Sequence, residues 1–210
     1  MVWMISHQHK CIFVHIPKCG GTSIEDLIWP GERTEADLWM GFTDSLGNRY
    51  QTGALQHLLA RHIRAEVGKA AFFAYFKFTI VRNPWDKALS QYAFMRRRDD
   101  LRAYIGMERD DEFKRYLELI GKRTHVQWMP QHAFIHDDDG AQMVDYIGRF
   151  ERLAHDVELI LQRVGVQGSL PHRKAATHRL AIADLDDEAI DMVAALYAED
   201  IRIFGYERPE

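Results

Sequence analysis

Residues 11–24 read CIFVHIPKCGGTSI, an apolar run that stops at a Pro/Gly-bounded turn and can continue as a helix. A run rich in Ile, Val and Phe is typical of a buried central strand. Gly20 and Gly21 allow a tight turn whose backbone N–H groups point inward, and Thr22 or Ser23 can begin a helix. A helix N-terminus carries about half a positive charge, and Lys18 adds a full charge beside it. The stretch therefore predicts a strand, an anion-binding loop suited to phosphate, and a helix.

The residue order in this loop differs from that of nucleotide triphosphatases. In their P-loop, G-x-x-x-x-G-K-[ST], the lysine follows the last glycine, whereas Lys18 precedes Gly20. A standard Walker loop is therefore excluded, and an ordinary strand-to-helix turn is the alternative to a phosphate site. A second stretch is needed to decide between them.

Composition indicates one globular domain over residues 1–210. Hydrophobic residues make up 47% of the chain, which shows no repeat and no low-complexity tract. No apolar run approaches the roughly 18 residues that cross a bilayer, and the first ten residues are too polar for a signal-peptide core. We therefore expect no membrane span and a cytoplasmic location.

The net charge of −4 argues against a general nucleic-acid binder, although Arg96 to Arg98 and Lys122-Arg123 could form a local basic rim.

The cysteines and the acidic residues suggest no disulfide framework and no metal centre. Cys11 and Cys19 are the only two cysteines, and we expect both to be reduced thiols. Cys19 lies near a helix N-terminus, which lowers a thiol pKa, but most loop thiols are bystanders. Asp137 to Asp139 lack the alternating spacing and the distant Glu of an EF-hand, so they predict a turn before Gly140. No tight Cys/His grouping indicates zinc.

The rest of the chain alternates strands with helices, which predicts an α/β fold with a mostly parallel sheet flanked by helices. We expect a strand over residues 75–81, a hairpin of residues 134–136 and 144–147, and helices over residues 22–28, 54–67, 84–98, 110–120, 151–164 and 186–203. Gly68, Gly165 and Gly205 are the expected helix stops. Residues 29–52 form a long irregular segment of a kind that often covers a ligand.

The second decisive stretch follows the strand of residues 75–81. Arg82 ends that strand, and Ser90 lies eight residues later on the next helix, so both can face one phosphate. Arginine offers a planar fork for phosphate oxygens, and the serine hydroxyl adds a donor. A surface ion pair for Arg82 and a bond from Ser90 to its own helix backbone are the alternatives. If the two strands are neighbours, both turns line one crevice at the carboxyl edge of the sheet.

Together, residues 13–23 (FVHIPKCGGTS) and 78–92 (FTIVRNPWDKALSQY) resemble the two donor-binding signatures of sulfotransferases that use 3′-phosphoadenosine 5′-phosphosulfate. The likeness is greatest to the carbohydrate branch, which includes heparan and chondroitin sulfotransferases and their soluble bacterial relatives. It extends through residues 56–57 (QH), 147–151 (IGRFE), 170–172 (LPH) and 197–206 (YAEDIRIFGY), and so spans most of the chain. The resemblance implies a P-loop-NTPase-like core.

Carried over residue by residue, the resemblance implies two phosphate-binding groups. Lys18, Cys19, Gly20, Gly21, Thr22 and Ser23 would bind the 5′-phosphosulfate, with Lys18 also stabilising the leaving phosphate. Arg82 and Ser90 would bind the 3′-phosphate. The resemblance implies no metal requirement.

The resemblance also implies a histidine that deprotonates the acceptor, and His57 occupies its position. Imidazole has a suitable pKa range for such a base. The chain has 11 histidines, most of which must have other roles, and His62 is the alternative base. His15, inside the first strand, is expected to be a core residue.

Two positions depart from the pattern of the relatives. Cys19 stands where they usually have Thr, which removes one side-chain donor and leaves the backbone N–H groups to compensate. Lys174 stands where Asn is expected, so nucleotide contacts are not carried over to that segment.

The predicted function is transfer of a sulfuryl group from 3′-phosphoadenosine 5′-phosphosulfate to an acceptor hydroxyl, expected on a carbohydrate, with adenosine 3′,5′-bisphosphate as the product. One alternative is a catalytically silent nucleotide-binding module. A P-loop kinase or NTPase is the other, and the position of Lys18 argues against it. The identity of the acceptor does not follow from the sequence.

Overall fold

The computed structural model describes residues 5–30, 57–170 and 180–210. The chain divides into two compact units, Met1–Val81 with Ala133–His172, and Arg82–His132 with Arg173–Glu210. The single domain over residues 1–210 stays a prediction. Most of the irregular segment expected over residues 29–52 lies outside the described residues, as do Gln56 and Lys174.

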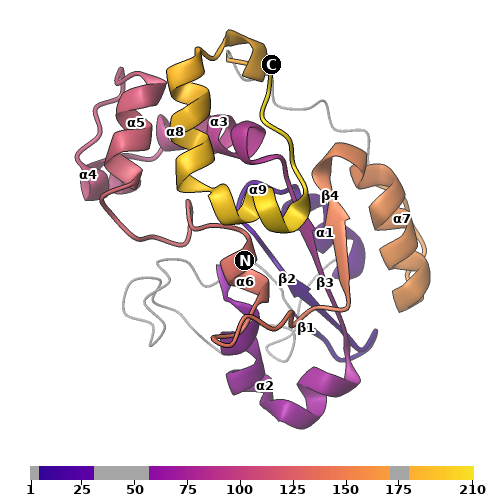
Figure 1. The fold of residues 1–210 in the computed structure, drawn as a ribbon. Helices are drawn as coiled ribbons and strands as arrows, with labels where there is room; N and C mark the ends of the chain where they lie inside the picture. Colours follow the sequence, from indigo (N-terminus) through magenta and orange to yellow (C-terminus); the bar gives the residue numbers. More distant parts are fainter. Residues whose placement is uncertain (1–4, 31–56, 171–179) are drawn as a thin grey trace. The chain divides into compact units, whose positions relative to one another are not determined.

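The first unit contains a four-stranded sheet in the order β1-β2-β3-β4 (Figure 1). Strands β2 (Cys11–Val14) and β3 (Phe76–Val81) are parallel neighbours, and β4 (Tyr146–Arg149) runs parallel to β3. The short strand β1 (Ile5–Ser6) pairs antiparallel with β2. This mostly parallel sheet confirms the predicted α/β class, and the pairing of β2 with β3 places the carboxyl ends of these two strands at one edge.

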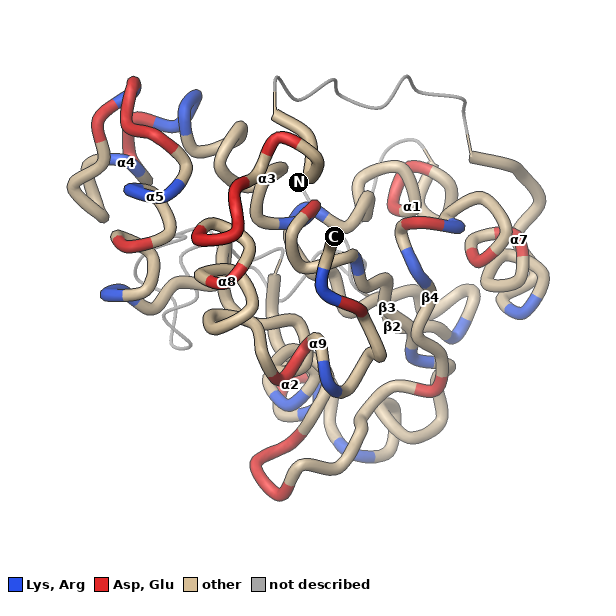
Figure 2. The backbone as a smooth tube through the Cα atoms, turned by 45° about the horizontal axis from the view of Figure 1, so that its top comes forward, with Lys and Arg blue, Asp and Glu red and all other residues tan. Residues whose placement is uncertain are grey.

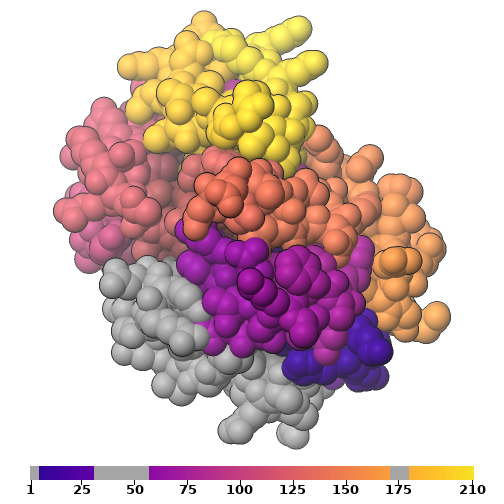
Figure 3. All heavy atoms as spheres, turned by 60° about the horizontal axis from the view of Figure 1, so that its bottom comes forward, coloured from indigo at the N-terminus to yellow at the C-terminus, as the bar shows by residue number. Residues whose placement is uncertain are grey.

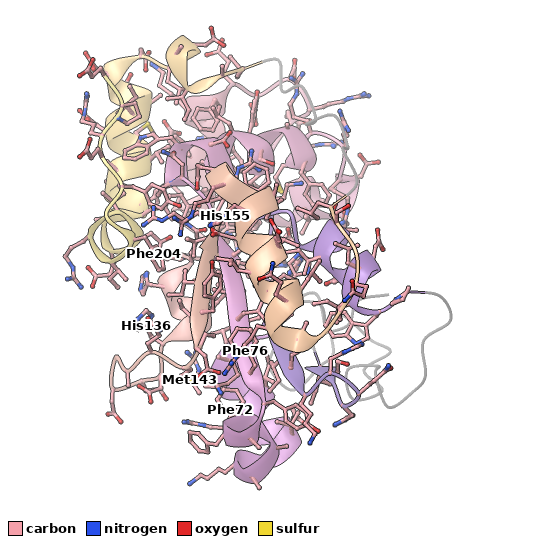
Figure 4. The ribbon with its side chains drawn as sticks, turned by 90° about the vertical axis from the view of Figure 1, so that its right-hand side faces the viewer. Phe72, Phe76, His136, Met143, His155 and Phe204 are labelled. Atoms are coloured by element: carbon pink, nitrogen blue, oxygen red, sulfur yellow. The ribbon has the colours of Figure 1, made fainter. Side chains whose placement is uncertain are left out.

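The apolar sequence of the central strands is explained by their burial. Helix α7 (Leu153–Val164) packs on β3 and β4, and α1 (Gly21–Ile28) buries Ile24 and Ile28 (Figure 1). The rings of Phe13 and Phe78 stack across β2 and β3 with centroids 5.1 Å apart. The ring of Phe76, which Figure 4 labels at the start of β3, stacks in turn on Phe78 with centroids 5.8 Å apart.

The helix expected over residues 54–67 differs from the prediction in its extent. Helix α2 spans Ala60–Ala74 and is interrupted at Gly68, whose φ of 80° and ψ of 154° are not helical, so Gly68 ends the first helical segment as predicted. A second helical segment, which was not predicted, follows the kink and contains the buried Phe72. Residues 54–56 lie outside the described part of the chain.

The predicted hairpin of residues 134–136 and 144–147 was wrong. Phe134 and Ile135 belong to the short helix α6 (His132–Ile135), and the later residues enter β4, which pairs with β3. Only one isolated bridge, between His136 and Gln142, joins the two segments. Both Phe134 and Ile135 are fully buried, which does not fit a strand that faces solvent on one side. The predicted turn is confirmed, because Asp137 accepts hydrogen bonds from the N–H groups of Asp139, Gly140 and Ala141.

The second unit is helical. It consists of α3 (Pro84–Met95), α4 (Asp99–Ile105), α5 (Phe113–Ile120), the 3₁₀ turn η3 (Ile182–Asp184), α8 (Asp187–Leu196) and α9 (Ala198–Phe204). Its core includes Trp85, Tyr116 and Val193. Helix α4 was not predicted, and the single helix expected over residues 186–203 is broken at Tyr197.

The predicted helix over residues 151–164 is confirmed, with its first turn formed as the 3₁₀ turn η2 (Phe150–Arg152) before α7. Gly165 and Gly205 are left-handed caps at the ends of α7 and α9, as predicted.

Candidate functional site

The loop after β2 adopts an unusual backbone conformation. Lys18 has a φ of 68° and Gly20 a φ of 82°, both in the left-handed region. Glycine adopts this region freely, whereas a lysine in it costs of order 1–3 kcal/mol, and such strain is concentrated at functional sites. Gly20 is also the N-cap of α1 and has no side chain to cap the helix. The loop therefore delivers Lys18 to a helix N-terminus of the kind that binds anions.

The second glycine of the loop is required by the His15 ring. A Cβ atom placed on Gly21 would lie 2.3 Å from Nε2 of His15, closer than real Cβ contacts. The His15 ring fills this space because its Nδ1 atom lies 2.7 Å from Oε1 of Glu25, one turn into α1. His15 is thus a core residue that packs the start of α1 onto the end of β2, as the sequence predicted.

We expect the substitution Gly21→Ala to reduce the free energy of unfolding by about 1–3 kcal/mol, because the methyl group overpacks the His15 ring. Urea denaturation of the variant and the parent protein measures this difference. Gly121→Ala is the matched control: Gly121 has a φ of −63°, and the nearest atoms to its Cβ would be at an ordinary 3.4 Å. Equal effects of the two substitutions would contradict the proposed contact.

His57, the predicted base, lies beside this loop in the first unit. Its Nδ1 atom is 2.9 Å from the carbonyl oxygen of His15, and the two rings meet edge to face with centroids 4.7 Å apart. A carbonyl oxygen only accepts hydrogen bonds, so Nδ1 of His57 must carry a proton. In the neutral ring, Nε2 is then the basic nitrogen. The structure therefore places His57 beside the loop that follows β2, with Nε2 as its basic nitrogen.

The charge state of His15 suits this arrangement. Burial, and to a smaller extent the positive charge of Lys18, lower the pKa of His15 to about 3. The ring is therefore neutral near pH 7 and donates its Nδ1 proton to the Glu25 carboxylate. Glu25 is only 2% exposed and was not identified from the sequence as part of the site. The sequence could have indicated Glu25, because it lies seven residues after Lys18 on the buried face of an amphipathic helix.

His62, the alternative base, lies in the first turn of α2. Burial, with a smaller contribution from Arg61, lowers its pKa to about 4, and Asp138 acts in the opposite direction. Oδ1 of Asp138 is 3.8 Å from Nη1 of Arg61. Figure 3 shows the surface of α2 adjoining the segment that contains Asp138. A group with a pKa near 4 is a weak base at neutral pH, which favours His57 over His62 for that role.

Both cysteines are free thiols, as expected, and the structure buries both. The Cys19 Sγ atom donates a weak hydrogen bond to the Pro17 carbonyl oxygen at 3.5 Å, so this side chain packs within its own loop. Burial raises the pKa of Cys11 to about 12. Cys19 can therefore assist an anion through its backbone, and neither thiol has the exposure of a reactive nucleophile.

In the second unit, Arg82 is followed by Asn83, the N-cap residue of helix α3. The Asn83 side chain caps the helix by accepting hydrogen bonds from the N–H groups of Trp85 and Asp86, and Pro84 occupies the first turn, as predicted. The Arg82 Nε atom donates to Asp86 at 2.8 Å. Asp86 and Ser90 are four residues apart and share one helix face. The Arg82 side chain therefore lies along the face that carries Ser90, and both residues are largely buried.

Sequence reasoning missed the residues that hold Arg82. The side chain of Gln131 and the carboxylate of Asp200 are completely buried and are hydrogen-bonded in series to the Arg82 backbone. They lie 49 and 69 residues from their partners along the chain. The only available signal was the acidic Asp200 in the closing segment of the resemblance.

The comparison with known families agrees with these observations. The sequence profile of the sulfotransferase family matches residues 2–207. The chain belongs to the sulfotransferase family. The mostly parallel α/β core of the chain agrees with the P-loop-like fold of this family, and the family match confirms the resemblance seen in the sequence.

Two relatives were found among characterised and uncharacterised proteins. The chain is 24% identical over 239 residues to carbohydrate sulfotransferase 14 of Danio rerio, covering 98% of the chain and 62% of that relative. It is 25% identical over 111 residues to an uncharacterized protein of Archaeoglobus fulgidus, covering 53% of the chain and 85% of that protein. No solved structure matches the chain at a significant level.

The described residues contain neither a membrane-spanning helix nor a group of side chains placed to bind a metal ion. Within residues 5–30, 57–170 and 180–210, no helix has the length and apolar character needed to cross a membrane. In the same ranges, no group of three or more His, Cys, Asp or Glu side chains is placed to hold a metal ion.

Proposed function

We propose that the chain transfers a sulfuryl group from 3′-phosphoadenosine 5′-phosphosulfate to a hydroxyl group of a carbohydrate. The observation that carries this proposal is the connection of His57 to the phosphate loop through the His15 carbonyl oxygen. It ties a basic nitrogen to the same loop that presents Lys18. Family membership supports the reaction type, and the name of the Danio rerio relative supports a saccharide acceptor.

Each residue then has a role in the transfer. The acceptor oxygen forms a bond to sulfur as the bond between sulfur and the 5′-phosphate oxygen breaks, and the acceptor proton moves to Nε2 of His57. Lys18 and the N-terminus of α1 stabilise the negative charge that develops on the leaving phosphate. Gly20, Gly21, Thr22 and Ser23, with the Cys19 backbone, bind the 5′-phosphosulfate, and Arg82 and Ser90 bind the 3′-phosphate. The proposed reaction needs no metal ion.

The basic rim suggested for an anionic glycan is mixed in charge. Figure 2 shows acidic and basic residues side by side around α4 and α5. Arg98 pairs with Asp100, and Arg123 lies over the ring of Tyr104 at 5.9 Å. These contacts favour no particular anionic saccharide, so the proposal stops at a carbohydrate hydroxyl.

The proposal predicts that adenosine 3′,5′-bisphosphate stabilises the protein. At 100 times its dissociation constant, a ligand that binds only the folded state adds about 2.7 kcal/mol of stability. A thermal-shift titration measures this, and radiosulfate transfer to a panel of saccharides then identifies the acceptor. Arg82→Ala is expected to weaken nucleotide binding, whereas a substitution of Glu158, which is exposed on α7 and has no role in the proposed site, is not.

The two measurements separate the alternatives. The absence of any shift at saturating nucleotide would remove the donor site. A shift without transfer to any acceptor would assign the protein to the nucleotide-binding modules. A shift with ATP and magnesium but none with adenosine 3′,5′-bisphosphate would favour a kinase or NTPase.

A further inference from the structure

The backbone of Arg82 is hydrogen-bonded to the side chain of Gln131, which lies 49 residues later in the chain. The Arg82 N–H donates to Oε1 of Gln131 at 2.8 Å, and Nε2 of Gln131 donates to the Arg82 carbonyl oxygen at 2.8 Å. Gln131 has no exposed surface. Its amide thus satisfies both backbone groups of Arg82, at the place where β3 has ended and α3 has not begun. Few side chains other than glutamine can donate and accept in this way.

Gln131 is itself held by a buried carboxylate. One oxygen of Asp200, in the first turn of α9, accepts from the Gln131 N–H at 2.7 Å. The other accepts from the N–H and from Nδ1 of His132, each at 2.8 Å. Asp200 is completely buried, and a carboxylate in this position is tolerated only because such donors surround it. The three residues form a series from α9 through Gln131 to the backbone of Arg82.

The hydrogen bonds from Asp200 through Gln131 restrain Arg82 at its backbone, which is where its guanidinium-bearing side chain begins. The backbone is fixed by Gln131, and the side chain is fixed by the ion pair between Nε and Asp86. A guanidinium binds phosphate well only when its planar fork is correctly directed, and an error of about 1 Å in such a group can be costly. A purely structural role would require the hydrogen bonds but would have no connection with the nucleotide.

We propose that Gln131 and Asp200 are positioning residues of the donor site, which act through Arg82 to set the preference for a nucleotide with a 3′-phosphate. This inference rests on the proposed role of Arg82. It assigns a function to α9 and to the segment before α6, neither of which touches the nucleotide in the proposed scheme. It also predicts that loss of either residue changes nucleotide selectivity and not merely stability.

The test compares the dissociation constants of adenosine 5′-phosphate and adenosine 3′,5′-bisphosphate, whose ratio we call the 3′-phosphate factor. Gln131→Met removes both hydrogen bonds at similar volume, and we expect the factor to fall by about tenfold, the effect of one misplaced charge-assisted bond. The affinity for adenosine 5′-phosphate should change by less than about twofold. Asp200→Asn, which keeps the shape but not the charge, should give a smaller fall in the same factor. The control is Gln127→Met, because Gln127 is also buried and bonds to Gln91.

A double substitution shows whether Gln131 acts through Arg82. In an Arg82→Ala background, Gln131→Met should leave the remaining 3′-phosphate factor unchanged, because the group that it positions is gone. An unchanged factor in folded Gln131→Met and Asp200→Asn would overturn the positioning role. Failure of both variants to fold would also overturn it, by assigning the residues to stability alone. If the unmodified protein binds both nucleotides equally, the proposed role of Arg82 fails instead.

Discussion

Replacing His57 with Ala is expected to lower kcat for sulfuryl transfer by about two to four orders of magnitude, the usual contribution of a general base. The affinity for adenosine 3′,5′-bisphosphate should change by less than about twofold, since the imidazole is assigned to the acceptor proton. The physical reason lies in the tautomer. The His15 carbonyl oxygen, 2.9 Å from Nδ1, holds the proton there and leaves Nε2 as the basic nitrogen. Single-turnover transfer of labelled sulfate measures the chemical step directly.

The matched control for this experiment is His62→Ala, which removes a histidine five residues later on α2. We expect its kcat to remain within about threefold of the parent value, because a group with a pKa of about 4 contributes little as a base at neutral pH. The opposite result, a normal rate in His57→Ala with a large loss in His62→Ala, would move the base to His62. Normal rates in both variants would show that neither histidine is the base.

The parts of the site that the sequence could predict depend on local signals. The strand, turn and helix of residues 11–24 are specified by an apolar run, a Pro and two glycines within one short segment, and the structure has β2, the loop and α1 there. Asn83 and Pro84 likewise begin α3 where their capping preferences predict it. Such features require no knowledge of the residues that pack against them.

The errors arise where tertiary contacts decide the conformation. Phe134 and Ile135 have strand-like sequence, but both are fully buried in α6, and the following strand β4 finds its partner in β3, 68 residues earlier at Phe78 and Tyr146. The Asp-Gly turn between the segments gave the correct local structure and the wrong pairing. Sequence periodicity cannot reveal the partner of a parallel strand, because the pairing is not local.

The same limit applies to the residues that support the site. The bond between Gln131 and Arg82 and the bond between Asp200 and Gln131 each join residues far apart in the chain. Neither a glutamine nor an aspartate has a periodicity that predicts such a partner. Glu25 is different, because its partner His15 is only ten residues away, and an acidic residue on the buried face of α1 could have been questioned.

Replacing Lys18 with Ala is expected to lower kcat by about two to three orders of magnitude, because it removes the positive charge assigned to the leaving phosphate. Nucleotide affinity should fall less than the rate, since the charge on the leaving oxygen develops only in the transition state. Lys18→Arg, which keeps the charge in a different shape, should retain more activity than Lys18→Ala. Single-turnover transfer and the dissociation constant of adenosine 3′,5′-bisphosphate measure the two effects separately.

The left-handed backbone of Lys18 makes a second variant informative. Lys18→Gly removes the same charge but can adopt a φ of 68° without strain, so it should be more stable to urea than Lys18→Ala by about 1 kcal/mol. We expect both variants to lose kcat by a similar factor, because the charge and not the backbone strain acts on the leaving group. Substantial activity in Lys18→Gly but not in Lys18→Ala would instead show that the loop conformation limits the reaction. Equal stability of the two variants would contradict the argument that this position is held under strain, and the strained lysine would then no longer mark the loop as functional.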